Sequence, residues 1–150
     1  MTYDVAFFIA LLATAIAFGG ALAHALELPN KMHMPQADYF TVQQVYRGWN
    51  RIAFVLAVQL FSLIGTAVFA RREPYVLAGA VLAIVCLLCA QAVFWIFTFP
   101  ANVATANWTT VPDNWESLRN SWEYSHLAGA AFQLIAMSAL AFAALARARS

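Results

Sequence analysis

The sequence predicts an all-α fold: a polytopic membrane protein built as a four-transmembrane-helix bundle, with helical extensions on one side of the membrane. Three observations predict this class. Hydrophobic residues make up 63% of the 150 residues and charged residues only 10%, whereas a typical soluble domain is roughly 25% charged. The mean hydropathy is +0.70. Four apolar runs approach the length of about 20 residues that a helix needs to cross a bilayer.

The four predicted spans are free of Asp, Glu, Lys and Arg, and the first contains one ionisable side chain, His24, close to its end. Helices are the expected form because a single segment in lipid must satisfy its own backbone hydrogen bonds. An even number of spans brings both ends of the chain to the same side. We therefore predict a single integral membrane domain over residues 1–150, with spans at about residues 5–26, 52–70, 76–99 and 127–146.

The connections between the spans are unequal. Residues 71–75 form a tight turn, whereas the other two connections run to about 25 residues each and lie on the side opposite the chain ends. Loops of this length usually carry function or structure of their own. Residues 36–51 contain no proline, and we expect them to extend the second helix outward. Asp113 and Glu116 have the spacing of a capping box, which predicts a final helix over residues 114–146.

Charges near the span ends bear on orientation and on partners. Lys and Arg number four on each side, but those on the side of the chain ends lie in short segments beside their spans, which favours cytoplasmic termini. We expect the membrane to be a bacterial inner membrane. The formal net charge of +1 excludes a nucleic-acid binder, which needs a basic face. The expected partners are the lipid bilayer and a hydrophobic small molecule, and the sequence leaves open whether the chain forms a homo-oligomer.

Ionisable side chains gather at the loop side of the predicted bundle. Groups buried at membrane depth face the bundle interior and usually pair, because lipid does not solvate them. His24 and Glu27 are three residues apart and share a helix face, as do Glu123 and His126. The two helices run in opposite directions, and in each the histidine lies deeper than the glutamate. The spacing therefore predicts that the two pairs lie level with each other.

Further polar and aromatic residues are expected at the same height. Arg47 and Arg51 are four residues apart on the predicted extension of the second helix. On the final helix, a spacing of three to four residues predicts one continuous stripe of side chains. This stripe consists of Trp115, Arg119, Trp122 and His126.

Three interpretations of this cluster are open. In the first, it is a structural cap held by salt bridges. In the second, one of the two histidines performs acid–base chemistry near neutral pH, while Arg47 or Arg51 holds an anionic substrate oxygen. In the third, the cluster binds non-haem iron or zinc, or the two histidines are axial ligands of a haem. The metal ligands would then be His24, Glu27, Glu123 and His126. No cofactor is favoured.

Other candidate groups carry less weight. Cys86 and Cys89 form a C-x-x-C pattern, but they lie within the third span, where no cation favours a thiolate, so we expect inert core residues. His33 lies between two methionines in a loop, where an exposed side chain is the simpler interpretation.

Two regions of the chain carry a family resemblance. One is residues 24–29, HALELP, followed by Tyr46 and Arg47. The other is residues 99–102, FPAN, followed by Trp115 and by residues 122–126, WEYSH. They resemble the end of helix one, the start of helix two and the segment before the last helix in the anthrone oxygenase-like family of small four-span membrane proteins.

The named fungal members of that family oxidise polycyclic anthrones to anthraquinones with dioxygen, reportedly without a metal or flavin. The resemblance implies an oxygenase-like activity here. It also implies functional roles for the matching positions, which are Glu27, Arg47, Asn102, Trp115, Trp122 and His126.

The leading hypothesis is an oxygenase-like enzyme that acts on a hydrophobic aromatic or quinone-type substrate entering from the lipid. In this hypothesis His126 is the general base, Arg47 stabilises the resulting oxyanion, and Trp115 and Trp122 form the pocket wall. The alternative is a non-enzymatic membrane protein, either a small-molecule binder or a subunit of a complex, and a third option is a metal- or haem-binding protein. The candidate catalytic residues are His126, Arg47, His24, Glu27 and Glu123. The candidate substrate-binding residues are Trp115, Trp122, Tyr46, Arg51, Asn102 and Arg119.

Overall fold

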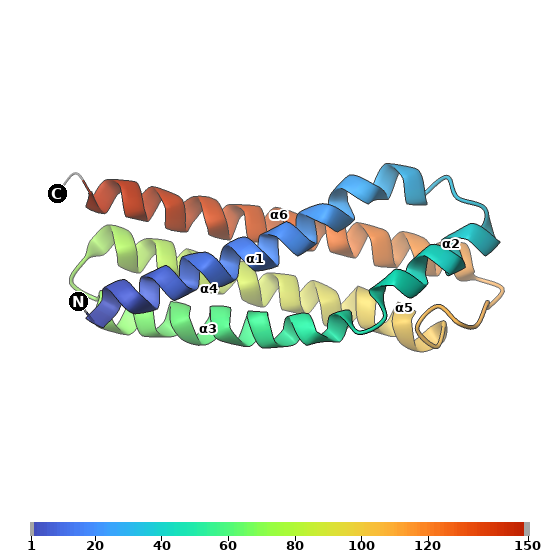
Figure 1. The fold of residues 1–150 in the computed structure, drawn as a ribbon, viewed down its shortest axis with the longest axis horizontal. Helices are drawn as coiled ribbons and strands as arrows, with labels where there is room; N and C mark the ends of the chain where they lie inside the picture. Colours follow the sequence, from blue (N-terminus) through green and yellow to red (C-terminus); the bar gives the residue numbers. More distant parts are fainter. Residues whose placement is uncertain (1, 149–150) are drawn as a thin grey trace.

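The computed structural model describes residues 2–148, and within this range all regular structure is helical (Figure 1). Within the same residues, four segments are long and apolar enough to cross a membrane, which confirms the predicted all-α, four-span class. These segments are Asp4–Lys31, Trp49–Phe69, Pro74–Ala104 and Trp115–Arg147. In chain order, the helices are α1 (Thr2–Lys31), α2 (Gln36–Gln43), η1 (Gln44–Tyr46), η2 (Trp49–Arg51), α3 (Ile52–Phe69), α4 (Pro74–Val93), η3 (Phe94–Thr98), α5 (Phe99–Ala104) and α6 (Trp115–Arg147).

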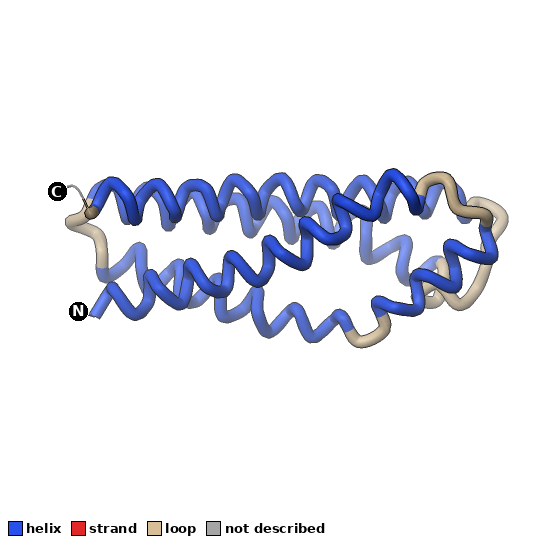
Figure 2. The backbone as a smooth tube through the Cα atoms, turned by 45° about the horizontal axis from the view of Figure 1, so that its top comes forward, coloured by secondary structure: helices blue, strands red, loops and turns tan. Residues whose placement is uncertain are grey.

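The four long helices α1, α3, α4 and α6 lie side by side with alternating directions, so both ends of the described chain lie at one end of the bundle (Figures 1 and 2). At the other end, α2, α5 and their loops form a cap. The core contains small and branched side chains such as Ala10, Leu63 and Leu140. The helices α4 and α6 approach closely at Gly79, where an added Cβ would lie 2.9 Å from the Cβ of Ala143. Small residues therefore set the packing distance of this pair.

A buried polar contact ties three spanning helices together. Gln59 of α3 donates to Oγ1 of Thr14 on α1 at 3.1 Å and to Oε1 of Gln133 on α6 at 3.0 Å. Gln133 in turn donates to Oε1 of Gln59 at 3.3 Å. Because lipid offers no competing partner, such bonds contribute about 1 kcal/mol each to helix association. They hold α1, α3 and α6 in one register.

The first helix is longer than the span predicted at residues 5–26. It runs on to Lys31 and includes Pro29, which lacks the N–H that a regular turn would use. Glu27 and Lys31 are therefore one turn apart on the same face of α1. This extension brings Lys31 to the loop-side end of the bundle, beside α2 and α6.

The connection from α1 to α3 is helical, but the prediction of one continuous extension over residues 36–51 is wrong. After α2 the chain forms the 3₁₀ turn η1, and Gly48 then adopts a left-handed conformation with φ of 90°. Glycine reaches this conformation at little cost because it has no Cβ. The bend places Tyr46 and Trp49 against His24 of α1.

The last helix, α6, contains 33 residues, Trp115–Arg147, which agrees with the predicted 114–146. At 1.5 Å per residue it is roughly 50 Å long, so its first turns extend beyond a bilayer core. The predicted capping box is wrong. The N-cap residue is Asn114 without a side-chain cap, because a backbone bond of 3.1 Å from Trp115 N to the carbonyl of Pro112 already forms the turn that contains Asp113.

The end of the third span changes its helical geometry. The wide turn η3 immediately precedes α5, in which Pro100 cannot donate a hydrogen bond and crowds the carbonyl four residues earlier. In this turn, the hydroxyls of Thr98 and of Ser125 on α6 lie 2.6 Å apart. Beyond α5, residues 106–108 adopt left-handed φ angles of 46°, 56° and 64°. This turn folds the Trp108 indole back toward α5.

Candidate functional site

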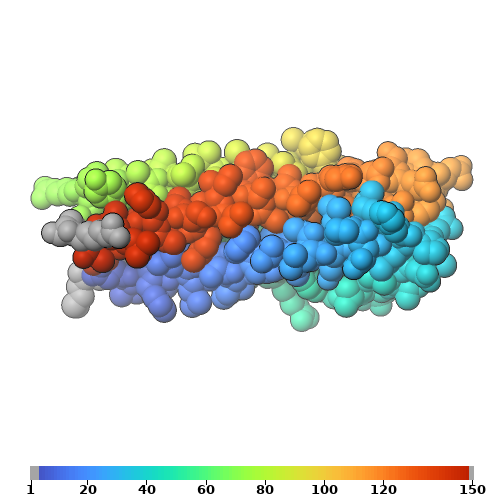
Figure 3. Space-filling view, turned by 90° about the horizontal axis from the view of Figure 1, so that it is seen from above, coloured from blue at the N-terminus to red at the C-terminus, as the bar shows by residue number. Residues whose placement is uncertain are grey.

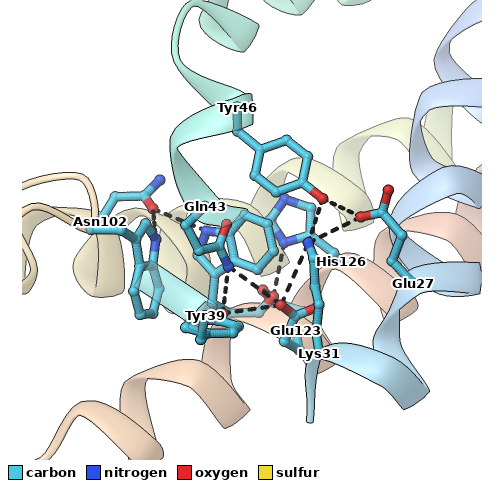
Figure 4. A network of polar contacts seen from close by, with 11 residues as sticks. Glu27, Lys31, Tyr39, Gln43, Tyr46, Asn102, Glu123 and His126 are labelled. Carbon is cyan, nitrogen blue, oxygen red and sulfur yellow. Dashed lines mark hydrogen bonds and ion pairs between the residues drawn. The ribbon is translucent and has the colours of Figure 1, made fainter. Parts of the chain in front are cut away.

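Side chains from α1, α2, η1, α5 and α6 converge at the loop-side end of the bundle (Figure 4). The two histidine–glutamate pairs lie level with each other, as the helical spacing predicts. The rings of His24 and His126 have centroids 4.4 Å apart. Both glutamates, Glu27 and Glu123, contact one shared cation, Lys31.

Lys31 is the central charge of this cluster, and the sequence did not single it out. Only 1% of the residue is exposed. Its Nζ lies 3.1 Å from Oε2 of Glu27 and 3.7 Å from Oε1 of Glu123. The same ammonium lies over two aromatic faces, 4.2 Å from the ring centroid of Tyr46 and 5.0 Å from that of Trp122. Two carboxylates and two π-faces together replace the water that a buried ammonium loses.

Glu123 is held firmly from three sides. It is 1% exposed, and its Oε1 accepts hydrogen bonds from Tyr39 at 3.0 Å and from Gln43 at 3.4 Å, in addition to the ion pair with Lys31. The pKa of Tyr39 is raised above its usual value, mainly by burial and to a lesser extent by the negative charge of neighbouring Glu123. The phenol of Tyr39 therefore stays protonated and remains a donor to the carboxylate.

Glu27 is held less firmly. Its side chain is 47% exposed, and its Oε2 contacts Lys31 and accepts a hydrogen bond from the hydroxyl of Tyr46. Burial and the hydrogen bond to Glu27 raise the pKa of Tyr46, so this phenol also stays protonated. Tyr46 accepts a bond from Lys31 in turn. The three groups form a closed triangle at the edge of the cluster.

The two histidines lie within an aromatic enclosure. His24 is buried, and its ring centroid lies 4.5 Å from that of Tyr46, 5.1 Å from that of Trp49 and 5.3 Å from that of Trp122. Trp122 also stacks on His126, with ring centroids 3.9 Å apart. These contacts fix the orientation of both imidazoles.

His126 has a defined neutral tautomer. Its Nδ1 lies 2.8 Å from the carbonyl oxygen of Trp122, so Nδ1 must carry the hydrogen that this contact requires. The lone pair of the neutral ring is therefore on Nε2, which is the basic nitrogen. In the second histidine, Nδ1 of His24 is buried without a hydrogen-bond partner in the described chain.

Asn102 positions the indoles that border the site. Its Oδ1 accepts from Nε1 of Trp122 at 2.9 Å and from Nε1 of Trp108 at 3.1 Å. One amide oxygen thereby links α5, the left-handed turn at residues 106–108 and α6. The predicted substrate-binding residue Asn102 lies behind Trp122, where it orients the indole.

The predicted arginines lie away from the histidines. Arg47 is exposed and donates to Oε1 of Gln44 at 2.9 Å, and Arg51 is exposed in η2. Arg119 stacks on Trp115, 4.7 Å from the ring centroid, and donates to the carbonyl of Met34 at 3.1 Å. Trp115 and Arg119 thus belong to the packing between α6 and the α1–α2 loop, and the cation beside the histidines is Lys31.

The residues present do not fit the metal or haem alternatives. Among the described residues, no three His, Cys, Asp or Glu side chains are grouped so that they could hold a metal ion. A haem between two axial histidines needs the rings on opposite sides of the porphyrin. The rings of His24 and His126 contact each other at 4.4 Å instead.

The rings of the cluster are in mutual contact, with the His24 centroid within 5.3 Å of those of His126, Tyr46, Trp49 and Trp122. In the space-filling view, the atoms of α1 and α6 meet along the face seen from above (Figure 3). A shallow groove of about 440 Å³ lies elsewhere, between η3 and α6, and includes Phe97 and Tyr124. A ligand of the histidines must therefore displace side chains at the edge of the cluster.

Sequence analysis missed four residues of this site: Lys31, Tyr39, Gln43 and Trp49. A signal existed for Lys31, since Glu27 and Lys31 have the i,i+4 spacing of a helical ion pair, but the proline between them suggested that the helix had ended.

Comparisons of the chain with family profiles, with curated proteins and with solved structures find no match.

Proposed function

We propose that this integral membrane protein is an oxygenase-like enzyme that acts on a hydrophobic aromatic or quinone-type molecule. One observation carries the proposal: two histidines in ring contact, 4.4 Å between centroids, lie beside a buried lysine inside an aromatic enclosure. A base, a cation and flat apolar walls are the groups needed to remove a proton from an aromatic substrate and to stabilise the anion that forms.

His126 is the general base in this proposal. The tautomer imposed by the Trp122 carbonyl leaves Nε2 as the basic nitrogen. A neutral imidazole held in one orientation can accept a proton from a substrate placed at its Nε2. His24, whose ring contacts that of His126, completes the acid–base pair.

Lys31 replaces Arg47 as the group that stabilises the oxyanion. The ammonium of Lys31 lies 5.0 Å from the ring of Trp122, which stacks on His126, whereas Arg47 bonds to Gln44 at the surface. A cation in a buried position acts on a developing negative charge more strongly than a solvated one.

The proposed substrate reaches the cluster from the lipid. Trp49 is 41% exposed and lies against His24, so it gives the cluster an apolar edge at the surface. Trp122 and Tyr46 are the flat walls on the inner side.

The proposed reaction is oxidation of a ring methylene that lies between two aromatic rings, opposite a ketone in the same central ring, with dioxygen as the co-reactant. His126 removes one proton from the methylene, and the resulting enolate is oxidised by dioxygen. The methylene loses two hydrogens and gains one oxygen atom as a carbonyl, and the second oxygen atom leaves as water. The family resemblance supports this chemistry.

We further propose a bacterial inner membrane with the chain ends in the cytoplasm. The Arg residues beside the spans at that end support this orientation. The cluster then lies toward the outer face of the membrane.

The test is anthrone oxidation by the purified protein in lipid nanodiscs, followed as anthraquinone formation and oxygen uptake above the rate without protein. His126→Ala should lower the rate at least about 100-fold, the usual contribution of a general base. His33→Ala is the matched control, because His33 is exposed in the loop after α1, and it should retain full activity. Full activity in His126→Ala would contradict the proposal.

A non-enzymatic role is the second candidate, and the dense packing of the cluster favours it. If the protein only binds a molecule or joins a complex, the wild type and His126→Ala will oxidise anthrone equally slowly. Mass spectrometry of small molecules extracted from the purified protein would then show whether it retains a ligand.

A further inference from the structure

Two partly exposed side chains cover the two most reactive buried groups of the cluster. The carboxylate of Glu27, whose side chain is 47% exposed, rests on Nζ of Lys31, whose side chain is 2% exposed. The ring of Trp49, a residue 41% exposed, lies against the buried ring of His24 at 5.1 Å. One cover is a carboxylate that contacts an ammonium, and the other is an indole whose ring meets an imidazole in a T-shaped contact.

The two carboxylates on Lys31 differ in how firmly they are held. Glu123 is buried and receives hydrogen bonds from Tyr39 and Gln43. Glu27 is half exposed and is bonded to Tyr46 and to Lys31 itself. Glu27 can therefore rotate into solvent, while Glu123 keeps one negative charge beside the lysine.

Trp49 is also held in a way that permits movement. It follows Gly48, the residue with φ of 90°, in the short turn η2, and a Cβ added at Gly20 of α1 would lie 3.9 Å from its ring. In the ring that Trp49 contacts, Nδ1 of His24 is buried without a hydrogen-bond partner in the described chain. When Trp49 turns outward, it uncovers a flat surface with one unused polar nitrogen.

We propose that the cluster binds a flat aromatic anion that displaces both covers. The ionised oxygen of the ligand, in a carboxylate, phenolate or enolate, takes the place of the Glu27 carboxylate on Lys31 and Tyr46. The aromatic body takes the place of Trp49 on His24. This inference rests on the proposed function, for which it names the substrate class.

Charge balance selects for an anion. Exchange of the Glu27 carboxylate for a ligand carboxylate or enolate leaves the number of charges around Lys31 unchanged. A neutral aromatic molecule in the same position would leave the buried ammonium with one carboxylate fewer, which is costly in a site that excludes water. Glu27 therefore competes with anionic ligands, and the site favours the ionised form of a substrate, such as an enolate, over its neutral form.

The test uses two probes of the same shape, the anion 2-naphthoate and the neutral 2-naphthamide. Binding is measured by quenching of tryptophan fluorescence in the full-length protein, held in phosphatidylcholine nanodiscs. Glu27→Gln removes the competing charge, so it should tighten 2-naphthoate binding on the order of tenfold, and in both forms of the protein 2-naphthoate should bind more tightly than 2-naphthamide. Glu116→Gln is the matched control, because it removes an exposed carboxylate from the same end of the bundle without touching Lys31; both probes should bind this variant as they bind the wild type.

A second variant tests the other cover. Trp49→Ala should tighten the binding of 2-naphthoate, because the ring that the probe must displace is gone. Weaker binding in Trp49→Ala would mean that Trp49 is part of the binding wall, and it would overturn the proposal. Binding of 2-naphthamide as tight as that of 2-naphthoate, no effect of Glu27→Gln on 2-naphthoate binding, or no naphthoate binding to any form would overturn it too.

The outcomes separate this inference from the proposed enzyme activity. If naphthoate binding responds as expected and anthrone is not oxidised, the anion site stands and the oxygenase activity fails. If anthrone oxidation depends on His126 and Glu27→Gln changes neither probe, the activity stands and the anion site fails.

Discussion

Lys31 shows how a single residue can determine the energetics of a whole cluster. An ammonium that is 1% exposed would be strongly destabilising on its own, and here it lies between Glu27 and Glu123 and over the rings of Tyr46 and Trp122. A buried ion pair of this kind adds little net stability relative to apolar side chains. Its retention in the fold is understandable if the charge has a task in binding.

Removal of Lys31 should expose this dependence. Lys31→Met leaves the buried Glu123 carboxylate without its cation and should lower the free energy of unfolding by about 3–5 kcal/mol. In a Glu123→Gln background, the same substitution should cost clearly less, because no buried charge is left unpaired. Denaturant unfolding in detergent measures both values. An equal cost in the two backgrounds would contradict the role assigned to the ion pair.

At the scale of helices, the contact between α4 and α6 depends on a missing side chain. An added Cβ at Gly79 would lie 2.9 Å from Ala143 Cβ and 3.0 Å from the Ala139 carbonyl oxygen. The second contact is to backbone, which cannot move aside without shifting the helix.

We therefore expect Gly79→Ala to destabilise the bundle by about 1–3 kcal/mol, the usual cost of overpacking. Gly129→Ala in α6 is the matched control. An added Cβ there meets nothing within 4 Å, and alanine favours a helix by up to about 1 kcal/mol. Thermal unfolding of the two variants should shift in opposite directions. A neutral Gly79→Ala would show that the helices are farther apart than described.

At the scale of the whole molecule, the four alternating helices separate the chain into two ends. The turn between α3 and α4 lies with the chain ends, and the cap with its His24–Lys31 cluster lies at the other end (Figure 1). With cytoplasmic chain ends, His33 faces outward across the membrane and Arg72 faces inward.

Cysteine labelling in intact bacterial cells tests this topology. In a background with Cys86 and Cys89 replaced by alanine, His33→Cys should react with a membrane-impermeant maleimide, and Arg72→Cys should react only after lysis. The reversed pattern would contradict the orientation alone. Labelling of both sites from the same side would contradict the four-span arrangement.

The fold could be predicted from the sequence because span length and hydropathy follow directly from bilayer thickness. The juxtaposition of His24 and His126 was also predictable, since it needs only antiparallel helices and the helical period. The ends of the helices were harder to predict from the sequence. A proline such as Pro29 normally indicates a break, but α1 continues through it.

The buried positive charge of the site, that of Lys31, could not be predicted either, because it too depends on local backbone geometry. The sequence offered Arg47 and Arg51 because a continuous helix over residues 36–51 would have brought them to the height of the histidines. The left-handed Gly48 bends this segment, so Tyr46 and Trp49 face α1 and both arginines remain at the surface. A backbone torsion of one glycine thus decides which side chains face the cluster.

The paired glutamines Gln59 and Gln133, bonded to each other and to Thr14, have a consequence for motion. They fasten α1, α3 and α6 partway along their length, so any opening at the aromatic end pivots there while the far half stays shut. If a molecule enters past Trp49 as proposed, we therefore expect it to leave by the same route.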